Sequence, residues 1–379
     1  MGTRKRIGLF FKYNANWIGG TYYWLNWVNV LNTLPDEEKP VMVIISDRSS
    51  FRYIEQETAY PYLEHYLWRN DKSLWYKILN VIPLRITGHR RFYNRLRGDF
   101  DALMPCCIGV SDVIPVPDSK RIYWFPDFQY AHLPEFYTPH IYVSERQSGI
   151  AAAYLSNKLM LSSEDAARDF HHFFPDSKAK VYVQHFTVTH PDISALNKEE
   201  VLRKHEIDRP YFYSPNQYWA HKNHPVVIDA VAELVKKGHN DILVLFSGKE
   251  WDDRNLNYVP SLKKRVEELD LTDNIRFLGF LDRKEQLVIM QNAQAVIQPS
   301  LFEGWSTVIE DARALNKYVI ASDLDVNKEQ LQTNVRFFDR HSSSELAKAI
   351  EKGHFDVTPM PYDQYRIAQA RSFMKMIDD

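Results

Sequence analysis

The sequence predicts an α/β protein made of two doubly wound parallel-sheet domains. Short apolar runs of about four to eight residues alternate with helical stretches, which is the pattern of a parallel sheet covered on both faces. The alternation occurs in both halves of the chain. A length of 379 residues agrees with two domains, because one hydrophobic core seldom serves so long a chain.

In the first half, the expected strands are separated by less regular segments. The run 6–11 is the first strand, and a loop and helix follow within 17–34. A polar segment at 195–209 has the character of a linker, so the domain boundary is expected near residue 207. The further strands expected here are 40–47, 101–110, 120–127, 158–164 and 180–186.

In the second half, each apolar run is followed by a helical pattern. The run 211–216 is the first strand, and the helix after it begins near 225 and stops at Gly238. Asp282 and Glu285 have the spacing of a capping box for another helix. The remaining expected strands are 241–248, 275–280, 293–300, 318–323 and 335–339.

The domains are therefore assigned as follows. Residues 1–206 form an N-terminal domain that contains a basic aromatic insertion at about 62–98, and residues 207–360 form a C-terminal domain. Residues 361–379 form a terminal helix that can cross back to the N-terminal domain.

Composition favours a cytoplasmic protein that does not bind nucleic acid. The formal net charge is −2, which gives no general attraction to phosphate backbones. The two cysteines, Cys106 and Cys107, are adjacent, so they form neither a disulfide framework nor a zinc motif. The N-terminus is expected to be a first strand and not a signal peptide. No apolar run approaches the roughly 18 residues that a membrane span needs.

The segment 72–98 has a distinct composition. It carries seven Lys or Arg residues and no acid, with apolar residues at helical spacing around Trp75. Such a segment can lie on an anionic membrane surface on the cytoplasmic side. It can equally be a pair of helices that covers a sheet, with a basic face that is solvated or holds an acidic acceptor. Both interpretations stay open.

The loops at the carboxyl ends of the second set of strands are the candidate site, because doubly wound sheets bind ligands there. A Gly-Trp-Ser-Thr turn follows the strand that ends at Ser300 and precedes a helix that begins near Thr307. Unpaired amides at a helix start suit a phosphate, Gly304 permits close approach, and Ser306 and Thr307 add hydroxyl groups.

Three carboxylates surround this turn. Asp311 lies four residues after Thr307, so its side chain can point back toward the turn and hold vicinal hydroxyls such as those of a ribose. Glu310 points about a quarter-turn away and is expected to be a surface or capping acid. Glu303 precedes the turn directly.

A cation is available in the loop after the strand 211–216. Lys222 lies in this strand-to-helix loop and can face the phosphate site. His221, Asn223 and His224 could form a small metal cluster, but no carboxylate has matching spacing, so a capping loop is favoured.

These residues resemble the retaining GT-B glycosyltransferases of family 4, also called glycosyl transferases group 1. SLFEGWSTVIEDARALNKYVIASDL is similar to the C-terminal motif of that family, in which two acids are separated by seven residues after a Pro-Ser strand end. Here the acids are Glu303 and Asp311, preceded by Pro299-Ser300. Asp replaces the second Glu of the family, and Asn316 replaces a Gly.

The resemblance extends over most of the chain and is strongest at 211–331. NQYWAHKNH resembles the phosphate-binding loop of the family, with Lys222 at the lysine position and Gln217 where Arg is usual. FPDFQYAH keeps Asp127 but has Pro126 in place of a His that approaches the donor sugar, and His132 is a nearby candidate. WIGGTYYW resembles the first-domain glycine loop, and FSGKE and IRFLGFLD resemble the nucleotide-side loops, which together supply Gly19, Gly20, Gly248, Gly279, Phe280 and Leu281.

The resemblance implies an enzyme of the GT-B fold, with a central cleft between two Rossmann-like domains. Such an enzyme moves a sugar from a nucleoside-diphosphate sugar to a glycan or lipid-linked acceptor, with retention and in cell-surface polysaccharide synthesis. Glu303, Lys222 and Asp127 are the catalytic candidates. No cofactor or essential metal is expected. The donor contacts are assigned to Gly19, Gly20, Gln217, Gly248, Gly279, Phe280, Leu281, Gly304, Trp305, Ser306, Thr307 and Asp311.

Three alternatives have distinguishing features. A sugar-nucleotide 2-epimerase of the same architecture would release UDP without an acceptor. A non-catalytic sugar-binding protein usually carries an export signal, which is not evident here. A dinucleotide oxidoreductase needs Gly-x-Gly-x-x-Gly after the first strand, and Gly19-Gly20-Thr-Tyr-Tyr does not supply it. The glycosyltransferase interpretation is preferred.

Overall fold

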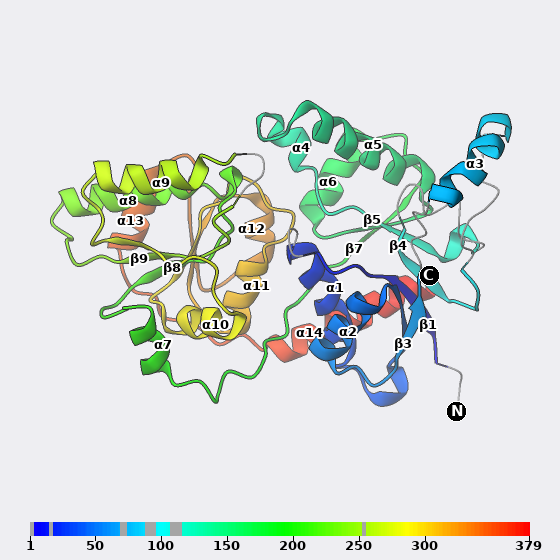
Figure 1. Cartoon of the computed structure of the whole chain (residues 1–379). Coiled ribbons are helices and arrows are strands. Elements are labelled where there is room, and N and C mark those ends of the chain that lie inside the picture. The colour runs from blue at the N-terminus through cyan, green and yellow to red at the C-terminus, as the bar shows by residue number, and fades with distance from the viewer. Residues whose placement is uncertain (1–3, 15–17, 69–73, 88–95, 107–115, 252–254) are drawn as a thin grey trace.

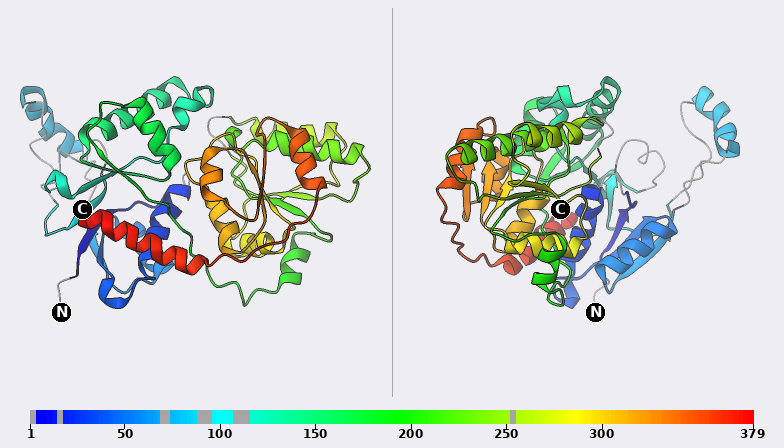
Figure 2. Two further views of the ribbon diagram at one scale, coloured as in Figure 1. Left: turned by 180° about the vertical axis from the view of Figure 1, so that it is seen from behind. Right: turned by 60° about the vertical axis from the view of Figure 1, so that its left-hand side comes forward.

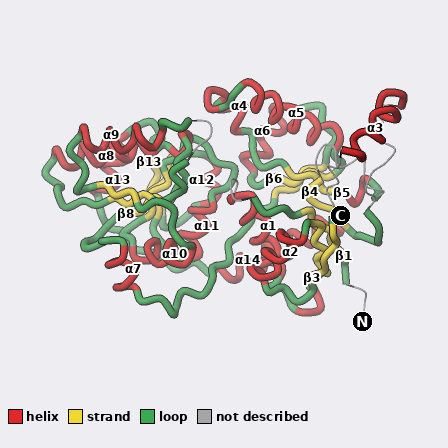
Figure 3. Tube along the Cα trace, in the orientation of Figure 1, coloured by secondary structure: helices red, strands yellow, loops and turns green. Residues whose placement is uncertain are grey.

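The computed structural model contains two α/β bodies side by side, each built around a parallel sheet (Figure 1). It describes residues 4–14, 18–68, 74–87, 96–106, 116–251 and 255–379. Figure 3 shows the strands at the centre of each body, with helices on both faces of the sheets. The predicted fold class is confirmed.

The N-terminal sheet has seven strands in the order β3-β2-β1-β4-β5-β6-β7. Neighbouring strands pair in parallel, and the first strand, β1, lies inside the sheet between β2 and β4. Their side chains are largely buried because helices cover both faces, which explains their continuous apolar sequences. The strands are β1 (Arg6–Phe10), β2 (Val41–Ser46), β3 (Leu63–Leu67), β4 (Ala102–Cys106), β5 (Arg121–Trp124), β6 (Lys158–Leu161) and β7 (Lys180–Val183).

The helices of this domain mostly follow its strands. Asp47 caps α2 by accepting a hydrogen bond from the Ser50 amide, and Ser163 caps α6 by accepting one from the Ala166 amide. The helices are α1 (Ile18–Leu31), α2 (Arg48–Thr58), α3 (Leu74–Thr87), α4 (Gln129–His132), α5 (Pro139–Leu155) and α6 (Glu164–Phe173).

The C-terminal sheet has six strands in the order β10-β9-β8-β11-β12-β13. The order reverses between β8 and β11, and such a switch point is where open α/β sheets bind ligands. The strands are β8 (Phe212–Ser214), β9 (Val244–Phe246), β10 (Ile275–Phe277), β11 (Val296–Gln298), β12 (Val319–Ser322) and β13 (Val335–Phe338).

Two buried apolar clusters cover the faces of the second sheet. Asp282 begins α10 by accepting from the Lys284 amide, but Glu285 does not complete the expected capping box. Its carboxylate instead binds Lys204 and His205 in and after α7. The helices are α7 (Lys198–Lys204), α8 (His224–Lys236), α9 (Tyr258–Glu268), α10 (Arg283–Asn292), α11 (Thr307–Ala314), α12 (Asp325–Gln330) and α13 (Ser343–Glu351).

The last helix, α14 (Tyr362–Asp378), lies against the N-terminal domain, where it is drawn in red in the left view of Figure 2. Its Phe373 ring stacks on Trp27 of α1 with 4.6 Å between ring centroids. Phe373, Met376 and Ile377 are part of the apolar cluster that also contains Leu9 and Ile44 of the first sheet. The chain therefore passes between the domains twice, once before β8 and once before α14.

The segment that was expected to be an insertion at 62–98 begins with part of the sheet. Leu63–Leu67 is strand β3, which pairs in parallel with β2 along its whole length. The pattern of apolar runs did not predict this strand, because exposed Glu64 and His65 lie at its centre and fit an edge strand and not a buried one. Beyond it, α3 stands off the body of the domain (Figure 2).

Candidate active site

The residues with predicted chemistry gather where β8 and β11 end. The 3₁₀ turn Ala220–Lys222 follows β8, and the loop 299–306 follows β11. The two loops are joined by a hydrogen bond of 2.7 Å from the Leu301 amide to the His221 carbonyl. Asn223 reinforces this link by donating to the Pro299 carbonyl. This pairing places Lys222 beside Glu303.

The Lys222–Glu303 pair is the centre of the site. Lys222 Nζ lies 2.6 Å from Glu303 Oε1, and the glutamate side chain is only 7% exposed. The same oxygen accepts hydrogen bonds from Gln298 Nε2 at 2.7 Å and Ser300 Oγ at 2.6 Å. Three donors thus converge on one oxygen of Glu303 and hold the carboxylate in one position.

Asp127 of the N-terminal domain faces this centre. It lies in the loop after β5, and Gly304 approaches it so closely that a Cβ at residue 304 would stand 2.8 Å from Asp127 Oδ2. Only glycine therefore fits at this point of the turn. Burial raises the pKa of the Asp127 carboxyl to about 6, with a smaller contribution from Glu303. The three predicted catalytic residues come together across the two domains.

The predicted nucleotide-side loops surround the ends of β8, β9 and β10. The Gly248 amide donates to the Gly279 carbonyl at 2.9 Å, and a Cβ at Gly248 would stand 2.4 Å from the Asn216 carbonyl oxygen. Gly279 has a φ of +67°, which favours glycine. Gln217 accepts a hydrogen bond from the Lys249 amide. Phe280 is exposed while Leu281 is buried, so one ring of this loop faces solvent.

Asp311 lies in the middle of α11, and its carboxylate already has partners. Arg283 binds both of its oxygens, at 2.7 and 2.5 Å, and His190 Nε2 lies 2.9 Å from Oδ1. Burial works to raise the pKa of Asp311, but the Arg283 charge and the His190 contact outweigh it and lower that pKa. A ribose hydroxyl at Asp311 would therefore join or displace existing partners.

Glu310 is not the surface acid that its sequence position suggested. It is fully buried, and its Oε2 accepts a hydrogen bond of 2.6 Å from the Tyr362 hydroxyl of α14. Gln330 and Arg313 bind its other oxygen. The predicted surface position was wrong because two of the partners, Gln330 and Tyr362, come from α12 and α14, which sequence spacing does not connect to α11.

The remaining residues of the turn contribute to packing and capping. The Trp305 indole donates to the Phe186 carbonyl at 3.2 Å and stacks on His185 of the chain segment after β7. Ser306 Oγ caps α11 by accepting from the Ile309 amide, and its own amide donates to Gln330. Thr307 is the first residue of α11. Trp305 thus packs against the N-terminal domain.

Gly19 and Gly20 lie in the first turn of α1, the helix that follows β1. A Cβ at Gly19 would meet no atom within 4 Å, so space alone does not demand glycine there. The resemblance to the family's glycine loop assigned these two residues to the donor phosphates, and that assignment stays a prediction.

His224, one of the histidines after β8, has a structural role in the core of the domain. His224 begins α8, is completely buried, and stacks on Tyr218 with ring centroids 4.8 Å apart. Burial lowers the pKa of its imidazole to about 3, so it is neutral at physiological pH. Over the described part of the chain, no group of three or more His, Cys, Asp or Glu side chains is arranged to hold a metal ion.

Three residues of the site were not predicted from the sequence. His190 and Arg283 lie far from Asp311 in the sequence and reach it only through the fold, whereas Gln298 lies five residues before Glu303. Gln298 could have been found from its place at the end of β11, since such positions face the ligand edge. His190 and Arg283 had no comparable signal.

The arrangement suits the binding and activation of a phosphate-bearing substrate. Lys222 offers a cation at the ligand edge of the sheet, and Glu303 offers a fixed carboxylate beside it. Asp127 adds a second carboxyl from the opposite domain, and its pKa of about 6 lets it change charge near neutral pH.

None of the helices in the described ranges is long and apolar enough to span a bilayer.

Comparison with known proteins agrees with these features. Residues 197–354 match the family model of the glycosyl transferases group 1. A stretch of 177 residues is 27% identical to the O-antigen chain mannosyltransferase RfbU of Salmonella typhimurium, covering 46% of this chain and 47% of that protein. The chain thus spans about half the length of the curated relative that it matches.

Two solved structures share the whole fold. A glycosyltransferase from Rickettsia africae superposes with a TM-score of 0.62 at 15% identity, covering 100% of this chain and 97% of the other. Anabaena HepE in complex with UDP-glucose superposes with a TM-score of 0.64 at 14% identity, covering 98% of each chain. These similarities confirm the GT-B fold.

Proposed function

We propose that this chain, a GT-B protein whose residues 197–354 match the model of the glycosyl transferases group 1, moves a sugar from a nucleoside-diphosphate sugar to a glycan or lipid-linked acceptor. The reaction proceeds with retention, as in the family-4 enzymes that the motif resembles. The role is synthesis of a cell-surface polysaccharide. The similarity to an O-antigen mannosyltransferase supports this role.

The Lys222–Glu303 centre carries the proposal. The ion pair is mostly buried at the carboxyl end of a strand, and Glu303 Oε1 accepts from three donors. Removing two charges from water costs free energy, so such a pair is expected where it serves binding or chemistry. A leaving diphosphate needs a cation, and Lys222 supplies one when the phosphate draws it from Glu303. Glu303 then contacts the donor sugar, whose oxocarbenium-like centre gains from a nearby carboxylate.

The other assigned residues complete the donor site. The ribose hydroxyls interact with Asp311, and the base lies by the loop of Gly279, Phe280 and Leu281. The diphosphate is bound between the Gly304–Thr307 turn and the first turn of α1 at Gly19 and Gly20. Closing the domains excludes water, which would otherwise hydrolyse the donor.

Asp127 is assigned to the sugar and acceptor side. It is the only one of the three catalytic candidates from the N-terminal domain, and it approaches Gly304 directly. Its carboxyl, with a pKa of about 6, can accept a proton from an attacking hydroxyl or stabilise positive charge at the anomeric carbon. No cofactor or essential metal takes part in this proposal.

The proposed function is tested by incubating the chain with UDP, GDP, TDP and ADP sugars and with lipid-linked or oligosaccharide acceptors. We expect one donor to be consumed in proportion to acceptor, in the presence of EDTA, with the product showing the anomeric configuration of the donor by proton NMR. Glu303→Gln is the inactive control. Release of nucleotide without any acceptor would favour the epimerase instead, and no consumption of any donor would contradict the proposal.

The acceptor side is proposed to contact an anionic membrane through α3. This helix exposes five large apolar side chains, and an exposed apolar surface of this kind indicates an interaction site. They are Ile78, Leu79, Val81, Ile82 and Ile86. The surrounding segment 72–98 carries seven basic residues and no acid, which complements anionic lipid head groups. A peripheral enzyme on the cytoplasmic leaflet could collect a lipid-linked acceptor in this way.

Flotation with phosphatidylglycerol vesicles tests the membrane contact. We expect the wild type to bind at low salt and to dissociate at high salt, and the Ile82→Ser/Ile86→Ser variant to bind weakly. The Leu256→Ser variant is the matched control, because Leu256 is similarly exposed but lies on the C-terminal domain. Equal binding by all three proteins, or none by the wild type, would exclude this surface.

A further inference from the structure

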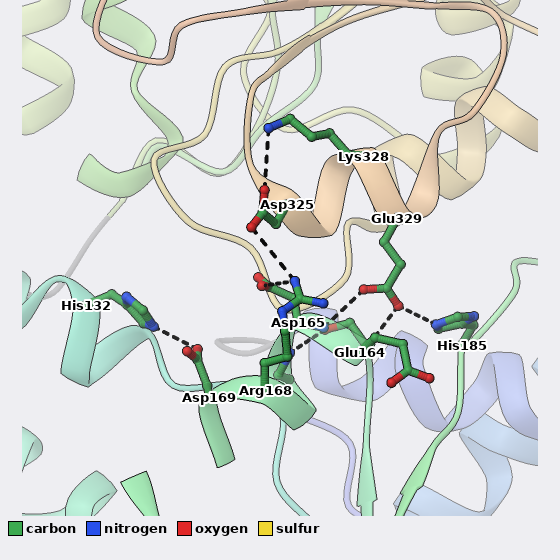
Figure 4. Close-up of polar contacts among 11 residues, drawn as sticks. His132, Glu164, Asp165, Arg168, Asp169, His185, Asp325, Lys328 and Glu329 are labelled. Atoms are coloured by element: carbon green, nitrogen blue, oxygen red, sulfur yellow. Dashed lines mark hydrogen bonds and ion pairs between the residues drawn. The ribbon is translucent and has the colours of Figure 1, made fainter. Parts of the chain in front are cut away.

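A partly buried carboxylate, Glu329, joins the two domains outside the Lys222–Glu303 centre. Glu329 belongs to α12 of the C-terminal domain, and α12 packs against α6 of the N-terminal domain. Figure 4 shows its side chain directed toward the start of α6 and toward His185. None of these residues was selected from the sequence.

Glu329 occupies the N-terminus of a helix in the other domain. Its Oε1 accepts from the Glu164 amide at 2.8 Å, and its Oε2 accepts from the Asp165 amide at 3.1 Å. These are the first two amides of α6, which have no partner within their own helix. A carboxylate at this position also interacts favourably with the helix dipole. The contact therefore favours the arrangement in which the two domains meet.

The same carboxylate connects to the catalytic loop. Glu329 Oε1 lies 2.6 Å from His185 Nε2. The His185 ring stacks on Trp305 with 4.2 Å between centroids and 6° between planes. Trp305 follows Gly304, and Glu303 precedes both. A chain of direct contacts thus runs from α6 through Glu329 and His185 to the loop of the Lys222–Glu303 centre.

The neighbouring residue of α12, Gln330, binds the same loop directly. Gln330 Nε2 donates to the Ser306 carbonyl at 2.9 Å, and its Oε1 accepts from the Ser306 amide at 3.2 Å. Movement of α12 would therefore move both α6 and the 303–306 loop. The exposed contacts around this helix are weaker, since Asp325 lies 3.9 Å from Arg168 and both are largely solvated.

We infer that Glu329 is a positioning residue for sugar transfer: its carboxylate fastens α12 to the start of α6 and so sets the Glu303 loop against the Asp127 face of the N-terminal domain. This inference rests on the proposed function for its effect on rate. The fastening itself is independent of any activity. An error of about 1 Å between reacting groups can cost as much as a hundredfold in rate.

Three variants test the inference in the full-length protein. Glu329→Ala removes both acceptors, Glu329→Gln retains one amide oxygen, and Asp325→Ala in the same helix is the control because Asp325 makes only solvated contacts. Hydrogen–deuterium exchange of the peptide that spans 162–167 and small-angle X-ray scattering are measured without substrate. Donor binding, kcat and KM are measured with substrate.

We expect Glu329→Ala to speed exchange at Glu164 and Asp165, to increase the radius of gyration, and to lower kcat by about tenfold to a hundredfold. The Kd for the nucleoside diphosphate should change by no more than about twofold, because the diphosphate residues are intact. Glu329→Gln should lie between this variant and wild type, and Asp325→Ala should match wild type.

Unchanged exchange and scattering in Glu329→Ala would overturn the fastening role. Looser domains with unchanged kcat would overturn the positioning role. If Asp325→Ala behaved like Glu329→Ala, the effect would belong to α12 in general and the assignment to Glu329 would fail. If the wild type transferred no sugar, the proposed function would fail, while exchange and scattering would still decide whether Glu329 fastens the domains.

Discussion

Glu303 and Glu310 lie seven residues apart in one stretch, and both are buried, yet their surroundings differ in kind. The partners of Glu303 are loop and strand-end residues at the ligand edge of one sheet, including the cation Lys222. The partners of Glu310 are Arg313, Gln330 and Tyr362, which join α11 to α12 and α14. Burial alone therefore does not identify a catalytic carboxylate; its partners and its place relative to the strand ends do.

The largest expected effect follows from Glu303→Gln. The substitution keeps the shape and most hydrogen bonds but removes the charge that faces Lys222 and the donor sugar. We expect the transfer rate to fall by about 10²–10³-fold, the range seen when a group that stabilises a transition state is removed. The far-ultraviolet circular dichroism spectrum should be unchanged. Transfer within threefold of wild type would show that Glu303 is a structural carboxylate like Glu310.

Glu310→Gln should reverse that pattern. Removing this charge leaves the mostly buried Arg313 without its ion-pair partner and weakens the Tyr362 contact, so we expect the free energy of unfolding to fall by about 3–5 kcal/mol. Urea denaturation measures this change. The folded fraction should retain kcat within a few-fold of wild type. A stable variant with strongly reduced kcat would remove the distinction between the two glutamates.

Asp311 falls between these two cases. It has the position of a ribose ligand but binds Arg283 and His190 as a structural ion pair would. We expect Asp311→Asn to raise the KM for the donor about tenfold with a smaller change in kcat, since the loss concerns substrate binding more than the reacting centre. Steady-state kinetics with the donor varied would reveal this. An unchanged KM would assign Asp311 to structure alone.

Asp127 is expected to have the smallest effect, which is a specific change in how the free energy of unfolding depends on pH. Because burial raises its folded pKa to about 6 from an ordinary 3.8, the folded chain binds more protons than the unfolded chain between these values. The free energy of unfolding therefore contains a contribution that decreases as pH rises from about 4 to 6. Glu303 and Glu145 strengthen this shift, and Lys222 opposes it.

Asp127→Asn should remove this contribution, so urea denaturation at several pH values should give a flatter profile than wild type in that window. If ionised Asp127 assists transfer, the rate of wild type should rise with a midpoint near pH 6, and the variant should lack that rise. Identical pH profiles for the two proteins would exclude Asp127 from the centre.

These cases show which features the sequence could predict. The alternation of apolar runs and helical segments predicted the two parallel sheets. A strand that is buried on both faces is a continuous apolar run, which can be recognised in the sequence without knowing which strands pair with it. The spacing of Glu303 and Lys222 relative to strand ends predicted their proximity, because parallel strands end at one edge. Strand β3 was not predicted, because it is an edge strand with exposed polar residues and is not a continuous apolar run.

The interior role of Glu310, the ion pair of Asp311 with Arg283, and the interdomain contact of Glu329 could not be predicted. Each depends on residues brought together from distant parts of the chain by packing between helices or domains. One sequence contains no information about such pairs unless they follow from the periodicity of a single element.

The central claim is that the Lys222–Glu303 centre binds the diphosphate and sugar of a nucleotide donor. The most direct measurement is the unfolding temperature of wild type, Lys222→Met and Glu303→Gln with UDP, GDP, TDP, ADP and their sugars. We expect one nucleotide to raise the unfolding temperature of wild type, Lys222→Met to lose that rise, and Glu303→Gln to keep it for the diphosphate while losing the further gain from the sugar. The claim would be contradicted if no nucleotide stabilised the wild type, or if Lys222→Met responded as the wild type does.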